Sequence, residues 1–254
     1  MAETEQDLIV LKNVTAGYPD NPILENLMFS VKKGEIFILL GGSGCGKSTV
    51  LKHMIGLNPA LAGELRIAGE EWKDETRESL YRRIGVTYQS GALFGSMTCL
   101  ENVLLPLETR FRLPKKERLA RAMAQLEAVE LADAANKMPS EISGGMRKRV
   151  ALARAMVLEP EILFLDEPSA GLDPLTSAAL DELILRLRKE RNITFVVVTH
   201  ELPSIFTIAD RCVVFDKARQ TMVALGTPRE LANNCPDKFV HDFFNRGGLL
   251  CPKA

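Results

Sequence analysis

The chain has 254 residues, of which 46% are hydrophobic and 26% are charged, and its formal net charge is −1. This composition is typical of a globular protein and excludes a disordered, collagen-like or coiled-coil chain. Basic and acidic residues balance, so there is no general electrostatic reason to bind nucleic acid, and we expect no nucleic-acid partner.

The sequence predicts no export signal and no membrane span. Its first seven residues are acidic and lack the positive flank and apolar stretch of a secretory signal. The strongest apolar run, residues 193–198, is far shorter than the roughly 20 residues that a membrane span needs. The five cysteines are scattered without a metal-binding pattern, which predicts reduced thiols in a cytoplasm.

Three short, nearly continuous apolar runs predict buried parallel strands at residues 35–40, 161–165 and 193–198. Each run is followed at once by small or polar residues. Ligands bind beyond the carboxyl ends of the strands in an open α/β sheet, so these three endings are expected to converge on one crevice.

Helical patterns alternate with these runs, which predicts an α/β fold. Helices are expected at residues 47–55, 115–129, 146–158 and 175–188. Shorter strands at residues 8–14, 63–69 and 82–88 are interpreted as an antiparallel β flap.

The predicted core consists of residues 1–90 and 150–254, and residues 91–149 form an inserted helical subdomain. Residues 234–254 form a C-terminal tail. Its apolar cluster, Phe239, Val240, Phe243 and Phe244, has helical spacing. The cluster is interpreted as packing within the chain, with a regulatory or dimer contact as the alternative.

A glycine-rich segment between a predicted strand and a predicted helix fits the phosphate-binding pattern G-x4-G-K-[S/T]. Glycines let the backbone turn its N–H groups toward phosphate oxygens, and the helix adds the positive end of its dipole. Lys47 is expected to reach the outer phosphates, and Ser48 to bind Mg²⁺. The residues of this loop that are expected to bind ATP are Gly41, Gly42, Ser43, Gly44, Cys45, Gly46, Lys47, Ser48 and Thr49.

Two adjacent carboxylates, Asp166 and Glu167, end the apolar run at 161–165. Apolar burial does not explain them. If this strand lies beside the phosphate loop, Asp166 can hold the Mg²⁺ shell and Glu167 can polarise an attacking water. The alternative is a pair of carboxylates at a solvated strand end.

Ser143, Gly144 and Gly145 precede a helix whose first turn carries the cations Arg147, Lys148 and Arg149. Ser143 is a good helix N-cap, which is the structural interpretation. The cations, however, oppose the helix dipole, and this composition favours an anion near that end of the helix.

With these motifs, the chain closely resembles the ATPase subunits of ABC transporters over nearly its whole length. The resemblance implies a RecA-like P-loop NTPase core with a parallel sheet. It also identifies Gln89 as the Q-loop glutamine, residues 142–146 as the signature, residues 169–173 as the D-loop and His200 as the switch histidine.

The resemblance implies a homodimer in which ATP lies between the phosphate loop of one subunit and the signature of the other. The implied catalytic residues are Glu167 as the base, His200 as a γ-phosphate contact, Gln89 and Lys47. The implied signature and D-loop contacts are Ser143, Gly144, Gly145 and Asp173. The implied Mg²⁺ ligands are Ser48, Gln89 and Asp166. Tyr18 matches the aromatic that stacks on adenine, with an ordinary surface tyrosine as the alternative.

Segments 89–94, 101–103 and 138–146, together with the signature ending in Met146, are similar to ATPases that serve MCE-protein lipid transporters, the Mla type included. This resemblance implies phospholipid traffic across the cell envelope, an integral membrane permease and an MCE-domain lipid-binding protein as partners. It implies a peripheral location on the cytoplasmic face of the inner membrane. Residues 92–94 are interpreted either as core or as part of a groove for a permease helix.

Three alternatives stay open. Another ABC importer or exporter shares all of these motifs. A soluble ABC ATPase of the iron–sulfur assembly type shares the nucleotide chemistry without a permease. A small-molecule kinase fits the phosphate loop but leaves the signature and His200 without a role.

Two positions stand out from the family pattern or add chemistry to it. Met146 replaces the glutamine that usually ends the signature, and we expect it to alter packing or coupling rather than catalysis. Cys45 lies in the phosphate loop near a helix start that could lower its thiol pKa, which makes redox control an alternative for this residue.

Overall fold

The computed structural model describes residues 7–110 and 112–245, and the chain divides into two compact units. The first unit comprises Met1–Tyr81 and Thr194–Ala254, and the second comprises Arg82–Ile193. The expected helical insertion at 91–149 lies inside the second unit, and its boundaries stay a prediction.

The first unit contains an antiparallel sheet in the order β2-β1-β4-β5. Strand β1 pairs with both β2 and β4. These strands are β1 (Asp7–Tyr18), β2 (Asn21–Lys32), β4 (Ala62–Ile67) and β5 (Glu70–Glu71). The antiparallel flap is thus confirmed for its first two predicted strands.

The same unit contains a second group of strands in the order β10-β9-β3-β8. Strand β3 is parallel to both β8 and β9, while β10 is antiparallel to β9. Every residue of β3 and β8 is buried, as their continuous apolar sequences predicted. The strands are β3 (Ile36–Gly41), β8 (Thr194–Val198), β9 (Arg211–Asp216) and β10 (Thr221–Gly226).

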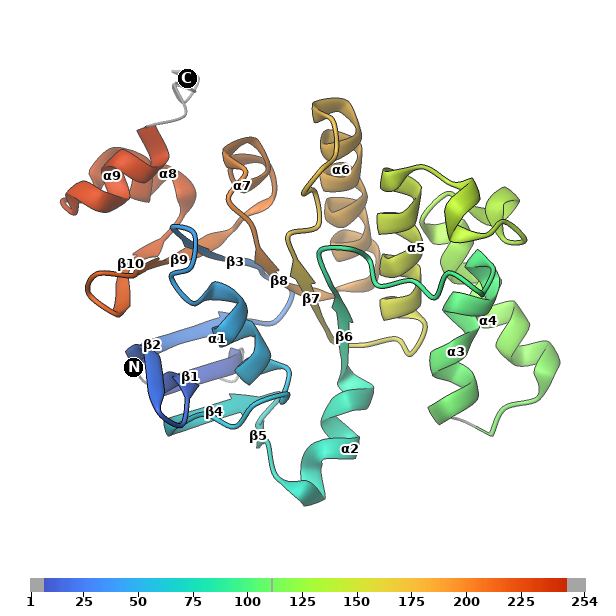
Figure 1. The fold of residues 1–254 in the computed structure, drawn as a ribbon, viewed down its shortest axis with the longest axis horizontal. Coiled ribbons are helices and arrows are strands. Elements are labelled where there is room, and N and C mark those ends of the chain that lie inside the picture. The colour runs from blue at the N-terminus through green and yellow to red at the C-terminus, as the bar shows by residue number, and fades with distance from the viewer. Residues whose placement is uncertain (1–6, 111, 246–254) are drawn as a thin grey trace. The chain divides into compact units, whose positions relative to one another are not determined.

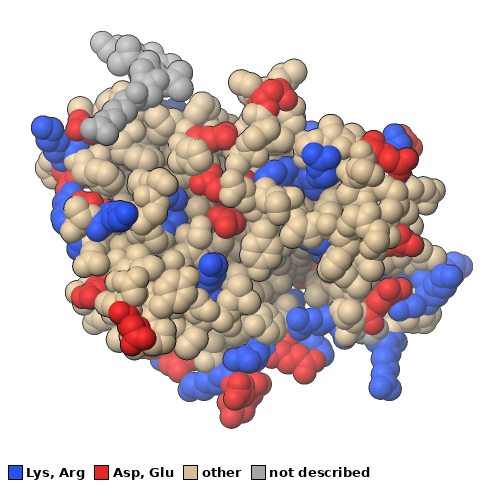
Figure 2. Space-filling model, in the orientation of Figure 1, with Lys and Arg blue, Asp and Glu red and all other residues tan. Residues whose placement is uncertain are grey.

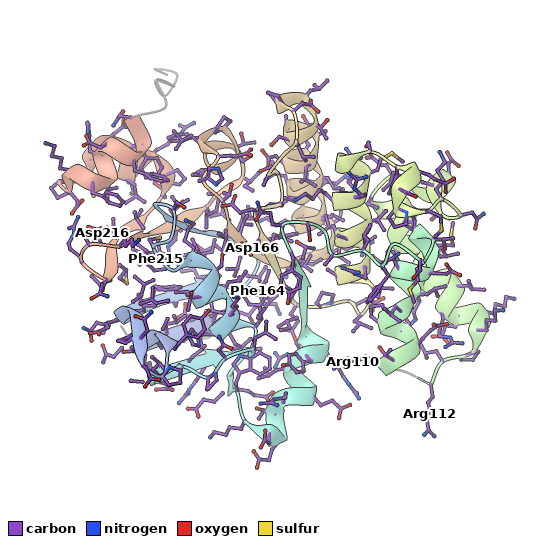
Figure 3. All side chains as sticks on the ribbon, viewed as in Figure 1. Arg110, Arg112, Phe164, Asp166, Phe215 and Asp216 are labelled. Atoms are coloured by element: carbon purple, nitrogen blue, oxygen red, sulfur yellow. The ribbon has the colours of Figure 1, made fainter. Side chains whose placement is uncertain are left out.

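Helix α1 (Lys47–Met54) lies between these two groups of strands (Figure 1). Between β2 and β3, the rings of Phe29 and Phe37 stack with centroids 5.4 Å apart, and Phe215 on β9, labelled in Figure 3, lies 6.4 Å from Phe29. The other helices that begin in this unit are α2 (Asp74–Arg83), α7 (Leu202–Ile208), α8 (Pro228–Asn234) and α9 (Lys238–Asn245).

The predicted apolar cluster of the tail forms one face of α9. Val240 and Phe244 are buried, and the Phe244 ring meets that of Phe206 on α7 at 5.8 Å. The cluster therefore packs within the chain. The rest of the predicted tail, residues 246–254, lies outside the described residues.

The second unit is mostly helical, and α3, α4 and α5 pack side by side in it (Figure 1). Its helices are α3 (Cys99–Arg110), α4 (Lys115–Ala128), α5 (Gly144–Met156) and α6 (Pro174–Arg191). Two 3-10 turns, η1 (Ala132–Ala134) and η2 (Pro139–Glu141), connect α4 to α5.

The interpretation of residues 82–88 as part of the antiparallel flap is wrong. Strand β6 (Ile84–Thr87) is parallel to β7 (Ile162–Asp166) in the second unit. A Cβ atom on Gly85 would lie 2.3 Å from the Ala155 carbonyl oxygen, so this strand packs against the end of α5. Burial of a short strand on both faces leaves no alternation from which its direction could be predicted.

Acidic and basic side chains are interspersed on the face shown in Figure 2, in keeping with the balanced composition. Within the described ranges 7–110 and 112–245, no helix is both long and apolar enough to span a membrane.

Candidate nucleotide-binding site

The phosphate loop connects β3 to α1, as predicted. Gly41 has a φ of 148°, and a Cβ atom there would lie 2.5 Å from both the Phe215 carbonyl oxygen and the Cys45 sulfur. Gly46 has a φ of 106°, and its Cβ would lie 2.8 Å from Ile23. These two positions therefore require glycine both for conformation and for space.

The start of α1 is suited to an anion. Gly46 is its N-cap and provides no side-chain cap, and the first turn contains no acidic residue. The backbone N–H groups and the positive end of the helix dipole thus meet no negative side chain of that turn. At Gly42, a Cβ would meet nothing within 4 Å, so this side of the loop is open.

Lys47 is held within the same loop. Its Nζ atom donates to the carbonyl oxygens of Gly41 at 2.9 Å and Gly42 at 3.0 Å. The ammonium group therefore lies over the loop, where phosphate oxygens would compete with neutral carbonyls for its hydrogen bonds.

The expectation that the helix start lowers the pKa of Cys45 is wrong. The thiol is buried, with 1% of the residue exposed, and burial raises its pKa, although the nearby Lys47 ammonium acts in the opposite direction. A buried thiol with a raised pKa is a poor nucleophile, so nothing in the loop favours redox control.

Two further predicted residues belong to the first unit. Tyr18 ends β1 and is 44% exposed, and His200 is an exposed residue just after β8. The Gly17 N–H donates to Nε2 of the buried His53 at 3.0 Å, and the other ring nitrogen lies 3.0 Å from the Asn58 carbonyl. His53 thereby ties α1 to the strand that presents Tyr18, a role that sequence patterns did not reveal.

Asp166 and Glu167 lie at the carboxyl end of β7, where Figure 3 labels Asp166. Glu167 has a φ of 47°, a left-handed conformation that is uncommon for a residue with a side chain. Its carbonyl oxygen accepts a hydrogen bond of 3.2 Å from Lys148 Nζ. The turn that directs this carboxylate is thus held by a cation from α5.

Gln89 lies in the exposed turn that follows β6. Its backbone carbonyl also accepts a hydrogen bond from Lys148 Nζ. Farther along the turn, Arg154 donates to the carbonyls of Gly91 at 2.9 Å and Ala92 at 2.8 Å. Helix α5 therefore binds both the Gln89 turn and the end of β7 through long cationic side chains.

Ser143 is the N-cap of α5, and its hydroxyl accepts a hydrogen bond of 3.2 Å from the Met146 N–H. A Cβ on Gly145 would lie 2.4 Å from Thr176 on α6, whereas the nearest atoms to one on Gly144 are 3.8 Å away. Gly145 thus permits the close approach of α5 to α6, in addition to any approach of a phosphate.

The cations of the first turn of α5 have partners within the second unit. Arg147 donates to the Ile142 carbonyl at 2.9 Å and Arg149 to Glu130 at 2.9 Å, while Lys148 binds the two carbonyls described above. These contacts explain the basic composition without an anion. The charges of these side chains therefore do not by themselves indicate an anion, and phosphate contact by the signature remains a prediction of the resemblance.

Asp173 is the N-cap of α6. Its carboxylate accepts hydrogen bonds from the backbone N–H groups of Leu175 at 3.1 Å and Thr176 at 3.0 Å. These bonds and that from the Thr176 hydroxyl favour the charged form and lower its pKa. Asp173 therefore has a structural role in addition to the predicted one.

The predicted site residues fall into two groups. The phosphate loop, Tyr18 and His200 belong to the first unit, and the predicted residues from Gln89 to Asp173 belong to the second. The predicted convergence of three strand ends involves both units and stays a prediction. In the described part of the chain, no group of three His, Cys, Asp or Glu side chains could hold a metal ion.

Comparisons with known proteins match the chain over most of its length. The model of the ABC transporter family matches residues 24–170. The intermembrane phospholipid transport system ATP-binding protein MlaF of Haemophilus influenzae is 39% identical over 229 residues, which make up 89% of this chain and 86% of that protein. The Fe(3+) ions import ATP-binding protein FbpC of Photorhabdus laumondii is 37% identical over 97% of this chain and 69% of its own length.

A solved structure has the same fold. The dimeric, post-hydrolysis ATP-binding cassette MJ0796, bound to ADP and Pi, superposes with a TM-score of 0.75 and 32% identity. The match covers 86% of this chain and 98% of that one. The predicted α/β fold of the P-loop NTPase type is thereby confirmed.

Proposed function

Because the chain belongs to the ABC transporter family, whose cassettes bind and hydrolyse ATP, we propose that it powers phospholipid transport across the cell envelope. The observation that carries this proposal is the similarity to MlaF, whose name specifies an intermembrane phospholipid transport system. The signature ending in Met146 supports it from the sequence. The chain is an ATPase. What we propose is that the transported substrate is a phospholipid.

In the proposed site, the phosphate loop binds the β- and γ-phosphates of ATP. Lys47 exchanges its two carbonyl partners for phosphate oxygens, and the N–H groups at the start of α1 donate to the same anion. Tyr18, at the exposed end of β1, stacks on the adenine ring.

Mg²⁺ fits the proposed donors because they are all oxygen atoms: the Ser48 hydroxyl, the Gln89 amide and the Asp166 carboxylate. When bound, the ion would neutralise charge that develops on the transferred phosphoryl group.

Glu167 is the proposed general base. Its carboxylate accepts a proton from a water molecule whose oxygen forms a bond to the γ-phosphorus as the bond to the leaving ADP oxygen breaks. His200 contacts the γ-phosphate. Ser143, Gly144 and Gly145 of a second copy of this chain complete the site, in a homodimer like that of the MJ0796 cassette.

The proposed partners are an integral membrane permease and an MCE-domain lipid-binding protein, which place the chain on the cytoplasmic face of the inner membrane. Phe94 is half exposed on the segment that follows Gln89, and it is the proposed contact for the permease. The similarity to FbpC favours one alternative, an ABC importer of another substrate.

The test is purification of the tagged chain from detergent-solubilised membranes of its native host, followed by mass spectrometry of proteins and lipids. A permease and an MCE-domain protein, with phospholipid enriched over a mock purification, are expected. A permease with a solute-binding protein would assign the chain to an importer instead. Recovery from the soluble fraction with cytosolic assembly proteins would contradict transport altogether.

A further inference from the structure

Lys148 joins two segments that carry proposed catalytic residues. Its single ammonium group donates to the backbone carbonyl of Gln89 and, at 3.2 Å, to that of Glu167. These residues lie 59 and 19 positions away along the chain. All three residues lie in the second unit.

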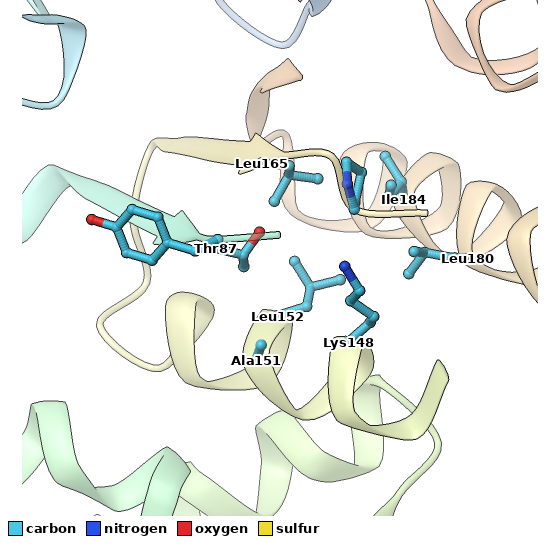
Figure 4. A pocket seen from close by; sticks show the side chains of 9 residues that line it. Thr87, Lys148, Ala151, Leu152, Leu165, Leu180 and Ile184 are labelled. Carbon is cyan, nitrogen blue, oxygen red and sulfur yellow. The ribbon is translucent and has the colours of Figure 1, made fainter. Parts of the chain in front are cut away.

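The side chain of Lys148 reaches these carbonyls through apolar surroundings. It lines a pocket with Leu152, Leu165, Leu180 and Ile184, and Figure 4 shows it extending from α5 toward the segment that follows β7. Its aliphatic stem packs on this surface while the charged end binds the carbonyls. The bond to Glu167 is partly buried, where a hydrogen bond is stronger than in water, and the bond to Gln89 is exposed. Because one ammonium group makes both bonds, the contact joins the two segments.

The cations of α5 bind backbone that adopts unusual conformations. Glu167 and Ala92 have φ values of 47° and 46°, and Gly91 has 75°. Lys148 binds the carbonyl of the first, and Arg154 binds those of the other two. Burial of the Arg154 guanidinium, which makes these bonds, lowers its pKa. Left-handed conformations persist where surrounding contacts hold them, and α5 supplies those contacts on both sides.

We infer that Lys148 is a positioning residue for ATP hydrolysis, which fixes the backbone of Gln89 relative to that of Glu167. This inference rests on the proposed roles of those two residues. Lys148 itself touches neither ATP nor water in this account. It sets the distance between the glutamine that binds Mg²⁺ and the carboxylate that accepts the proton.

A positioning role predicts a loss of turnover without a loss of ATP binding. The phosphate loop contains its own lysine, so ATP affinity does not depend on Lys148. Misplacement of a reacting group by about 1 Å costs on the order of 100-fold in rate. We therefore expect Lys148→Met, which keeps the apolar stem, to lower kcat at least roughly tenfold while KM for ATP stays within about twofold.

The experiment compares Lys148→Met, Lys148→Gln and Lys148→Arg in the assembled transporter, with Lys116→Met on the exposed face of α4 as the matched control. Lys148→Arg keeps a cation that can donate to both carbonyls, so it is expected to retain most of kcat. The kcat of Lys116→Met is expected to equal that of the parent protein. Wild-type kcat in both Lys148→Met and Lys148→Gln would overturn the inference. So would equal losses of kcat and ATP affinity in these variants.

Hydrogen exchange measured by mass spectrometry separates this inference from the proposed function. Lys148→Met is expected to accelerate amide exchange in peptides that cover residues 88–93 and 166–170, with no change in the peptide of α1. Unchanged exchange in both peptides would overturn the inference even if activity fell. If the parent transporter hydrolysed ATP without moving phospholipid, the proposed function would be wrong, while kcat and amide exchange in the variants would still decide the role of Lys148.

Discussion

Two lysines in this molecule each bind two backbone carbonyls, but over very different distances along the chain. Lys47 binds Gly41 and Gly42, six and five residues before it, within one loop. Lys148 binds Gln89 and Glu167, which belong to segments that follow different strands. The first contact can be exchanged for a ligand without moving any other segment, whereas the second holds two segments in place.

This difference suggests a division of labour between the two units. The phosphate loop is the proposed ATP-binding segment, and consecutive residues specify its glycine turns and the helix start that follows. The end of β7 and the Gln89 turn carry the residues proposed for turnover, and α5 binds these two segments, which lie far apart in sequence. Variants in the first region should therefore change affinity, and variants in the second should change rate.

The largest effect is expected from Glu167→Gln, which keeps the shape of the side chain and removes its basicity. Because a general base contributes roughly 10² to 10⁴ in rate, kcat should fall by that factor while ATP affinity is kept. Phosphate release and equilibrium binding of labelled ATP measure the two quantities. Glu182→Gln on the exposed face of α6 is the control, and near-normal hydrolysis by Glu167→Gln would exclude Glu167 as the base.

Lys47→Ala should give the opposite result. Loss of charge-assisted hydrogen bonds to phosphate is expected to cost about 1.5 to 3 kcal/mol, a rise of roughly 10- to 150-fold in the Kd for ATP. Isothermal titration calorimetry measures this change, with Lys52→Ala on the same helix as the control. Unchanged affinity in Lys47→Ala would remove the basis for assigning binding to the first unit.

Gly145→Ala tests whether the close packing of α5 on α6 stabilises the second unit. A Cβ there would lie 2.4 Å from Thr176, and such overpacking costs about 1 to 3 kcal/mol in the free energy of unfolding. Gly144→Ala is the matched control because its Cβ would have only ordinary contacts. Urea denaturation should show a lower free energy of unfolding for Gly145→Ala alone. Equal stability of Gly145→Ala and Gly144→Ala would show that α5 is not tightly packed at this point.

The smallest effect is expected from Arg219, an exposed cation that binds Asp237 through both carboxylate oxygens, at 2.5 and 3.1 Å. The hydrogen bonds from Arg219 lower the pKa of Asp237 to about 2. Since the folded pKa lies below the ordinary value of 3.8, the pair stabilises the fold at pH above 3.8 and loses that contribution as the pH falls toward 2.

Carbon NMR of the Asp237 carboxyl group measures this pKa directly. Arg219→Ala should raise it toward 3.8, although the backbone N–H groups of Phe239 and Val240 would still favour the charged form. Stability at neutral pH should change little because exposed ion pairs contribute little. A large loss of stability at neutral pH would contradict the expectation that this exposed ion pair contributes little to the fold.

The same comparison explains what could be predicted from the sequence. The strand β3, the phosphate loop and α1 follow one another, and the residue types at each position specify the local conformation. The contacts of Lys148 and Arg154 could not be predicted, because backbone carbonyls 59 to 63 residues away have no sequence signature. For the same reason the basic first turn of α5 suggested an anion, while its actual partners are mostly carbonyls.

The direction of strand β6 was predicted wrongly for a related reason, because its partner strand is far away in the sequence. Residues 82–88 fit the flap as a short strand interrupted by glycine, yet β6 pairs with a strand more than 70 residues later. The fully buried strands β3 and β8 were predicted correctly because their apolar runs are longer and β-branched. Cys45 shows the limit for chemistry, since burial overrides the helix start and the nearby lysine in setting the direction of its pKa shift.

The central claim is that two copies of this chain share ATP between the phosphate loop of one and Ser143 to Gly145 of the other. Sedimentation of Glu167→Gln with saturating ATP and Mg²⁺ tests it most directly. The account predicts twice the mass of one chain for Glu167→Gln with ATP. It predicts the mass of a single chain without nucleotide, and also with ATP when the same chain carries Lys47→Ala as a second substitution. A single chain at saturating ATP would contradict the claim.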